Sequence, residues 1–228
     1  MEVLVTLGQY LQVITQQEEF REMTKQKTTL VNFILDETGS MGNVLDQTIT
    51  GFNEYVDTLR ASEQPMVMSL VKFNSNGIKT VFENTNISEV PELTGKNYCP
   101  AAMTPLIDAV GQTIHQIDER LLILKGQKKA LPLILCVVLT DGFENASTEY
   151  TRSQIFDMVQ ERERQGWTFV FLGADQDAWN TSQYLGFSLG NTMSYDSTNT
   201  NDMYRNLATI TVAYVTTGEK TNSFFNDK

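Results

Sequence analysis

Three short apolar runs stand out along the chain because each is followed at once by a loop that carries an acid. The runs cover residues 30–35, 133–139 and 167–172, and branched or aromatic side chains dominate them. Apolar runs of this length are typical of strands that are buried on both faces of a parallel sheet. We therefore expect three central strands. The acids that follow them are Asp36, Asp141 and Asp175.

Helical spacing marks the segments between and after these strands. Apolar residues recur in steps of three and four over residues 45–59 and 106–124, which predicts two amphipathic helices. Residues 151–165 predict another helix, which Gly166 ends. Weaker helical patterns cover residues 15–23, 177–185 and 201–216.

Two further segments have strand character. Residues 66–73 and 78–82 flank an Asn-Ser-Asn-Gly turn, which predicts a β-hairpin. Residues 209–215 are β-branched enough for a strand that competes with the last helix. The Ser-, Thr- and Asn-rich residues 191–201 are expected to form a loop. The alternation of buried strands with helices predicts parallel βαβ units and an α/β, doubly wound sheet with helices on both faces.

The composition is that of an ordinary globular chain with an acidic balance. The 228 residues carry 28 Asp and Glu against 17 Lys and Arg, a formal net charge of −11. No basic stripe is present, so we expect no nucleic-acid partner. Two cysteines and one histidine exclude a disulfide scaffold, a four-thiolate zinc site and His-rich metal centres. No apolar run is long enough for a membrane span or a signal-peptide core, so we expect a cytosolic protein without a membrane partner.

The chain shows no internal repeat and no linker that would divide it into two domains. Residues 1–28 are polar and irregularly patterned, and we expect them to form an N-terminal extension to a single domain over residues 29–228. In open α/β sheets, functional sites lie beyond the carboxyl ends of the strands. The acids after the three buried strands are therefore expected at the functional edge of the sheet.

The loop after the first buried strand is rich in oxygen ligands. Asp36 supplies a carboxylate, and Thr38 and Ser40 supply hydroxyls at alternate positions. Asp141 is the natural second carboxylate, and Thr104, before the second long helix, can supply a third hydroxyl. Hard oxygen donors of this kind suit Mg2+ or Mn2+. These five residues therefore indicate a divalent-cation site.

The same residues resemble a known family. The series Asp36-x-Thr38-x-Ser40, then Thr104, then Asp141-Gly142 resembles the metal-ion-dependent adhesion site of von Willebrand factor type A (vWA) domains, with Thr38 where the family has serine. The resemblance covers residues 29–173 and implies a vWA domain over 29–228. It implies an α/β fold with a doubly wound, mostly parallel six-stranded sheet and one antiparallel edge strand, which the hairpin at 66–82 would supply.

The resemblance also implies how such a site works. Mg2+ or Mn2+ would be held by the five residues, some directly and some through water, and an Asp or Glu of a partner protein would fill the open coordination position. Two departures from the family pattern are Ala101-Ala102-Met103, where glycines are common, and the bulky Phe143 after Gly142. The segments 139–147 and 171–175 are similar to stand-alone vWA proteins of bacteria and tailed phages.

Two alternatives to a protein-binding module stay open at the level of sequence. One is a structural or assembly component of a phage particle, in which case the protein would be associated with the virion, or of a surface complex. The other is a metal-dependent phosphoryl hydrolase. The hydrolase has no candidate general base beyond Glu37 and Glu144, which we expect to be solvated charges at the rim, so we predict that the chain is not an enzyme. Asp175 is expected to cap the helix that follows it.

Overall fold

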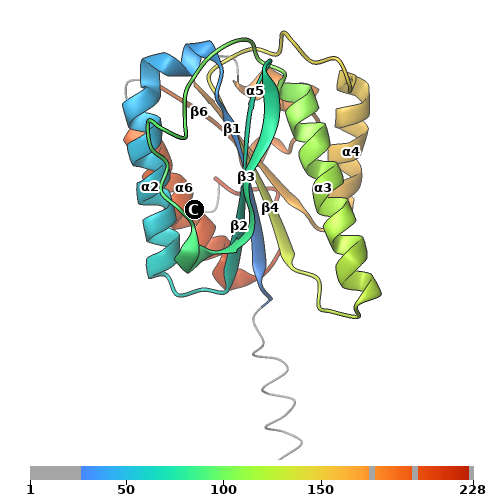
Figure 1. The fold of residues 1–228 in the computed structure, drawn as a ribbon. Coiled ribbons are helices and arrows are strands. Elements are labelled where there is room, and N and C mark those ends of the chain that lie inside the picture. Colours follow the sequence, from blue (N-terminus) through green and yellow to red (C-terminus); the bar gives the residue numbers. More distant parts are fainter. Residues whose placement is uncertain (1–26, 175–177, 197–199, 226–228) are drawn as a thin grey trace, which may run out of the picture.

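The computed structural model describes residues 27–174, 178–196 and 200–225. In this part of the chain, six strands form one sheet in the order β3-β2-β1-β4-β5-β6, with helices on either side (Figure 1). The strands are β1 Thr29–Asp36, β2 Met66–Asn74, β3 Gly77–Asn86, β4 Leu133–Thr140, β5 Thr168–Ala174 and β6 Thr192–Tyr195. The α-helices are α2 Leu45–Ala61, α3 Leu106–Gly126, α4 Arg152–Arg164, α5 Ala178–Tyr184 and α6 Thr200–Thr217. The short 3-10 helices are η1 Gly39–Val44, η2 Ile87–Glu89 and η3 Leu189–Asn191.

The sheet is parallel except at one edge. β1 lies between β2 and β4, with Asp36 opposite Phe73 and Leu35 opposite Leu139. β4 pairs in parallel with β5, and β5 with β6. β3 pairs antiparallel with β2 through the predicted hairpin. The predicted doubly wound sheet of six strands with one antiparallel edge strand is therefore confirmed.

Alternate side chains of each central strand enter two separate cores. In β4, Leu135 and Val137 belong to the core beneath α2 and α6, whereas Cys136 and Val138 belong to the core beneath α3 and α4. Figure 1 shows the same division, with α2 and α6 on one face of the sheet and α3 and α4 on the other. Burial on both faces explains why these strands are continuous apolar runs in the sequence.

The position of the sixth strand, β6, was not predicted. It occupies residues 192–195, within the segment that we expected to be a loop, and pairs with β5 from Phe171 to Ala174. Its sequence is Thr-Met-Ser-Tyr, and only Thr192 and Tyr195 are buried. A strand of four residues with polar positions at an edge leaves no apolar run for sequence analysis to detect.

The last segment is a helix, so the competing strand interpretation of residues 209–215 was wrong. The buried residues of α6 include Met203, Tyr204, Leu207 and Ala208, which follow helical spacing and pack in the core that α2 shares. Packing on that face outweighs the β propensity of its Thr, Ile and Val residues. Within the described ranges, no helix is both long and apolar enough to cross a bilayer.

Some predictions fall wholly or partly on parts of the chain that are not described. The expected helix at 15–23 and nearly all of the extension over 1–28 lie outside the described residues. The expected capping role of Asp175 also lies outside them. The helix expected at 177–185 is described from Ala178 and corresponds to α5.

Candidate metal centre

The strand order creates a switch point between β1 and β4. From β1 the chain passes through α2 to β2 on one side of it, whereas β4 lies on its other side and leads on to β5. The loops after β1 and β4 therefore diverge, and a crevice opens at the carboxyl ends of these two strands. Asp36 ends β1 and Asp141 directly follows β4, so the fold brings both predicted carboxylates to this edge, which lies uppermost in Figure 1.

Asp36 is the buried end of the site. Its side chain has no exposed surface, and its Oδ1 accepts a hydrogen bond of 2.7 Å from the backbone N–H of Thr38. Its Oδ2 accepts one of 2.6 Å from the hydroxyl of Thr140. Burial raises the pKa of Asp36 to about 6, helped by the charge of Asp141 and opposed by the bonds from Thr140 and Thr38. An ionised carboxylate at this position is therefore costly unless a cation lies beside it.

A series of oxygen atoms leads from Asp36 toward the surface. The hydroxyls of Thr38 and Ser40 lie 3.3 Å apart, and the Ser40 hydroxyl donates a hydrogen bond of 2.6 Å to Oδ1 of Asp141. Thr38 is buried, Asp141 is half-buried and Ser40 is exposed. The two loops thus meet through side-chain oxygens, with one end of the series open to solvent.

Thr104 reaches the same place from the loop before α3. A methyl group at Gly142 would lie 3.0 Å from the hydroxyl oxygen of Thr104 and 3.5 Å from that of Ser40. The Thr104 hydroxyl therefore lies next to the contact between Ser40 and Asp141, and the absence of a side chain at Gly142 leaves room for it. Two hydrogen bonds to Asn145 fix the backbone of Thr104. The N–H of Thr104 donates to Oδ1 of Asn145 at 2.8 Å, and the backbone N–H of Asn145 donates to the carbonyl of Thr104 at 3.1 Å.

The structure thus places all five predicted ligands at one edge of the sheet. The donor set is two carboxylates and three hydroxyls, and the described residues hold no cluster of three or more His, Cys, Asp or Glu side chains suited to a metal. Mg2+ and Mn2+ fit such a set, because they prefer oxygen ligands and retain several waters. Ligation by Asp36, Thr38, Ser40, Thr104 and Asp141 stays a prediction.

Glu37 is a buried residue that holds the loop after β1 in place, so the expectation that it is a solvated rim charge was wrong. Its side chain is buried and its Oε1 accepts hydrogen bonds from Lys72 Nζ at 2.6 Å and from the N–H of Cys99 at 2.7 Å. Its carbonyl accepts from the N–H of Ala101 at 2.9 Å. One residue thereby ties the Asp36 loop to the loop before α3. Lys72, a cation inside the apolar strand β2, was the available sequence signal for a buried acid.

Glu144 is also a structural residue and not a solvated rim charge. Its Oε2 accepts from the N–H of Ile107 at 2.8 Å, and its Oε1 accepts from the N–H groups of Ala146 and Ser147. An acid that binds free N–H groups in the first turn of a helix is favoured by the helix dipole. Glu144 therefore anchors the Asp141 loop on the amino end of α3.

Asp108 completes this anchor, and sequence analysis missed it. Its side chain is buried within the first turn of α3. Its two carboxylate oxygens accept hydrogen bonds of 2.7–3.0 Å from the N–H groups of Thr148, Glu149 and Tyr150. A single buried carboxylate thus fixes three consecutive backbone groups of the loop that carries Asp141.

The two departures from the family pattern lie at the rim of the site. Ala102 has a positive φ of 66°, a conformation that favours glycine, and its carbonyl accepts from the N–H of Gly39 at 3.1 Å. Met103 and Phe143 are exposed to 56% and 62%. Because each is adjacent to a loop residue that forms the site, both present apolar surface around it.

Comparison with known proteins gives a likeness of fold. No family model matches the sequence, and no curated protein matches it. Among solved structures, the pilus adhesin SpaC from Lactobacillus rhamnosus GG in its open conformation superposes with a TM-score of 0.63 at 13% identity, over 83% of this chain and 30% of that one.

Two further structures share the fold. A von Willebrand factor type A protein from Catenulispora acidiphila has a TM-score of 0.56 at 13% identity, over 82% of this chain and 43% of that one. Proximal thread matrix protein 1 from the mussel byssus has a TM-score of 0.54 at 10% identity, over 82% of this chain and 46% of that one. The chain spans less than half the length of each of these three proteins. Its sheet order, its layers and these superpositions show that the chain has the fold of a von Willebrand factor type A domain.

Proposed function

We propose that this chain is a protein-binding module that captures an acidic residue of a partner through a divalent cation. The observation that carries the proposal is the meeting of two distant loops, in which Ser40 contacts Asp141 beside the buried carboxylate of Asp36. Two carboxylates and their neighbouring hydroxyls gather at the switch point of the sheet, where α/β folds place their ligand sites.

The donor chemistry supports Mg2+ or Mn2+ as the cation. Asp36, Thr38, Ser40, Thr104 and Asp141 are the residues that would hold it. When bound, the cation would supply an electropositive centre with coordination positions for water and for a partner's carboxylate. The burial of Asp36 supports this proposal, because a cation is the partner that compensates the lost hydration of its ionised form.

The surface around the site supports a protein as the partner. Met103 and Phe143 are exposed large apolar side chains, and such residues at the border of a charged site are suited to contact with another protein. One of the structures that share the fold is a pilus adhesin. By analogy with that protein, we propose that this chain binds a protein, and we assign no particular partner to it.

We also propose that binding involves no catalytic step by this chain. The two carboxylates considered as general bases are committed to other contacts, Glu37 to Lys72 and Glu144 to the amino end of α3. A general base must be within reach of the proton that it removes. Their hydrogen bonds support a module that binds its partner without chemical conversion.

Capture in the presence and absence of the cation tests the proposal. The immobilised full chain is exposed to a protein extract of its source organism in Mg2+ and, separately, in EDTA, with Asp36→Ala as the site variant. Asp57→Asn is the matched control, because Asp57 is exposed on α2 and pairs only with Arg60 among the described residues. We expect capture by the parent and Asp57→Asn in Mg2+ alone. Equal capture by the parent and Asp36→Ala, or capture that survives EDTA, would contradict the proposal.

A further inference from the structure

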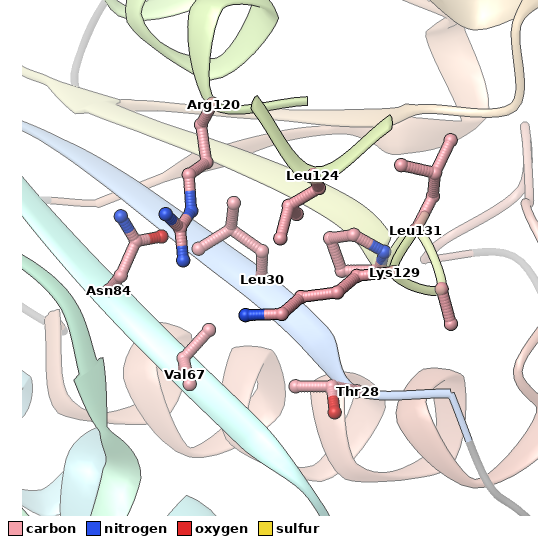
Figure 2. Close-up of a pocket in the computed structure, with 10 residues that line it drawn as sticks. Thr28, Leu30, Val67, Asn84, Arg120, Leu124, Lys129 and Leu131 are labelled. Carbon is pink, nitrogen blue, oxygen red and sulfur yellow. The ribbon is translucent and has the colours of Figure 1, made fainter. Parts of the chain in front are cut away.

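A second cleft lies at the opposite edge of the sheet from the candidate metal centre. It has a volume of about 230 Å³ and is formed where β1 and β2 begin, beside the last turns of α3 and the segment that leads into β4. Figure 2 shows its lining. The residues that line it are Thr28, Leu30, Val67, Asn84, Arg120, Leu124, Lys129, Ala130, Leu131 and Pro132.

One side of this cleft is apolar. Leu30 of β1, Val67 of β2 and Leu124 of α3 contribute side chains to it, and Leu131 stays 36% exposed beside them. A cavity of roughly 150 Å³ with apolar walls is enough to hold benzene. The larger volume of this cleft therefore suits a compact apolar group of about ring size with a short substituent.

The charged side chains of the cleft are both cations. Arg120 and Lys129 extend into it, toward the side of Leu30 and Val67 (Figure 2). No acid is among its described lining residues, and neither cation forms an ion pair with a residue that the structure describes. Glu83 lines a smaller neighbouring cavity together with Arg120, but its Oε1 accepts from Asn84 at 3.0 Å. Two cations that form no ion pair with a described residue, in a chain of net charge −11, favour an anionic ligand.

We propose that this cleft binds a small carboxylate with a compact apolar body. The guanidinium of Arg120 presents a planar fork that matches a carboxylate, and Lys129 adds a second positive charge. The body of the ligand covers the apolar side formed by Leu30, Val67 and Leu124. A single ligand thereby satisfies both halves of the lining.

The nearby end of α3 distinguishes this ligand from inorganic phosphate. Arg120 and Leu124 belong to the last turns of a helix that ends at Gly126, and the carbonyl groups at a helix C-terminus carry partial negative charge. That end of a helix disfavours a compact dianion, whereas phosphate sites commonly use the amino end. A carboxylate with one charge and an apolar body avoids this cost.

Titration of the full chain with 3-phenylpropionate tests the proposal, followed by NMR of Leu and Val methyl groups. We expect saturable shifts centred on Leu30, Val67 and Leu124, unchanged by Mg2+ or EDTA because the metal centre lies at the other edge. The uncharged analogue 3-phenylpropanol and inorganic phosphate should each bind at least about tenfold more weakly. If 3-phenylpropanol binds as tightly as 3-phenylpropionate, the proposed role of the two cations is wrong. If inorganic phosphate binds more tightly than 3-phenylpropionate, the proposed apolar body of the ligand is wrong.

Variants with matched charge changes sharpen this test. Arg120→Gln should weaken 3-phenylpropionate about tenfold, and Lys129→Gln should weaken it several-fold. Lys129 is exposed in a loop, so its replacement keeps the test valid even if Arg120→Gln fails to fold. Lys125→Gln is the control, because Lys125 lies in the same last turn of α3 but does not line the cleft. Unchanged affinity in Lys129→Gln, or an equal loss in Lys125→Gln, would overturn the proposal.

Discussion

The hydroxyl of Ser40 donates a hydrogen bond of 2.6 Å to the carboxylate of Asp141, although the two residues are 101 positions apart in the chain. The contact joins the loop after β1 to the loop after β4 at the switch point between these two strands. Because each loop also carries a carboxylate, the pairing concentrates negative charge in one place, and the proposed cation would offset that charge.

Loss of one negative charge from the site should therefore weaken cation binding. Asp141→Asn keeps the size of the side chain and an oxygen that can accept from Ser40, but it removes a negative charge from the donor set. We expect at least a tenfold loss of Mg2+ affinity in calorimetric titration, about 1.4 kcal/mol or more. Asp57→Asn, on the surface of α2, should titrate like the parent. Equal affinities of parent and Asp141→Asn would contradict the assignment of Asp141.

The raised pKa of Asp36 predicts a pH dependence for the metal-free chain. Its value of about 6, above the ordinary 3.8, means that the folded state holds the proton more tightly than the unfolded state. The free energy of unfolding should therefore fall as the pH rises from about 4 to about 6, with an Asp36 contribution of up to about 3 kcal/mol. Below this range both states are protonated and the contribution to stability is fully present.

Urea unfolding in EDTA across this pH range measures that slope. Asp36→Asn is the matched variant, because its side chain stays neutral and keeps an oxygen for the N–H of Thr38. The difference in free energy of unfolding between parent and variant should narrow at low pH and widen as the pH approaches 6. Saturating Mg2+ should reduce the decrease in free energy of unfolding that the parent shows as the pH rises. Parallel curves for the two proteins would show that Asp36 titrates as an ordinary carboxyl.

Gly142 is predicted to matter for the cation more than for stability. An added methyl group would press on the Thr104 hydroxyl at 3.0 Å, so Gly142→Ala should displace a proposed ligand. We expect about a tenfold loss of Mg2+ affinity with a change below about 1 kcal/mol in the free energy of unfolding. In Gly42→Ala the new methyl group meets no atom within 4 Å, and that variant serves as the control. An unchanged affinity in Gly142→Ala would argue against Thr104 as a ligand.

The ion pair of Lys72 and Glu37 should be important for stability. Both side chains are about one-tenth exposed, and Lys72→Met leaves a buried carboxylate without its cation. We expect a loss of about 3 kcal/mol in urea unfolding, partly recovered in the double variant with Glu37→Gln. Arg164→Met, which breaks the exposed pair with Glu161, should change the free energy of unfolding far less, because solvent screens an exposed pair. Similar losses of free energy of unfolding in Lys72→Met and Arg164→Met would show that the buried ion pair is no more important for stability than the exposed one.

The positions of the predicted ligands could be foreseen because they depend on strand ends. Burial on both faces makes β1 and β4 apolar without alternation, so their ends, and hence Asp36 and Asp141, are visible in the sequence. Parallel strands then bring those ends to one edge. Thr104 was identified from its place just before a predicted helix, and the family pattern then supported the choice of this hydroxyl.

The residues that support the site could not be foreseen in the same way. Glu37 and Glu144 look like solvated acids because their partners, the ammonium of Lys72 and backbone N–H groups of distant segments, are brought near only by the tertiary fold. Asp108 lies on the amphipathic helix α3 and its bonds go to a loop about 40 residues later. β6 was missed for a different reason. It has only four residues, only two of them are buried, and its sequence Thr-Met-Ser-Tyr contains no apolar run.

A crystal of the full chain, soaked in Mn2+ and measured for anomalous scattering, shows directly whether a cation binds at this site. We expect one strong anomalous peak between Ser40 and Asp141, with oxygen atoms of the Asp36 loop and of Thr104 in its direct or water-mediated coordination. The same crystal soaked in EDTA should lose the peak. Absence of a peak at this edge in the Mn2+ crystal, or a peak whose neighbours exclude Asp36 and Asp141, would contradict cation binding by these residues.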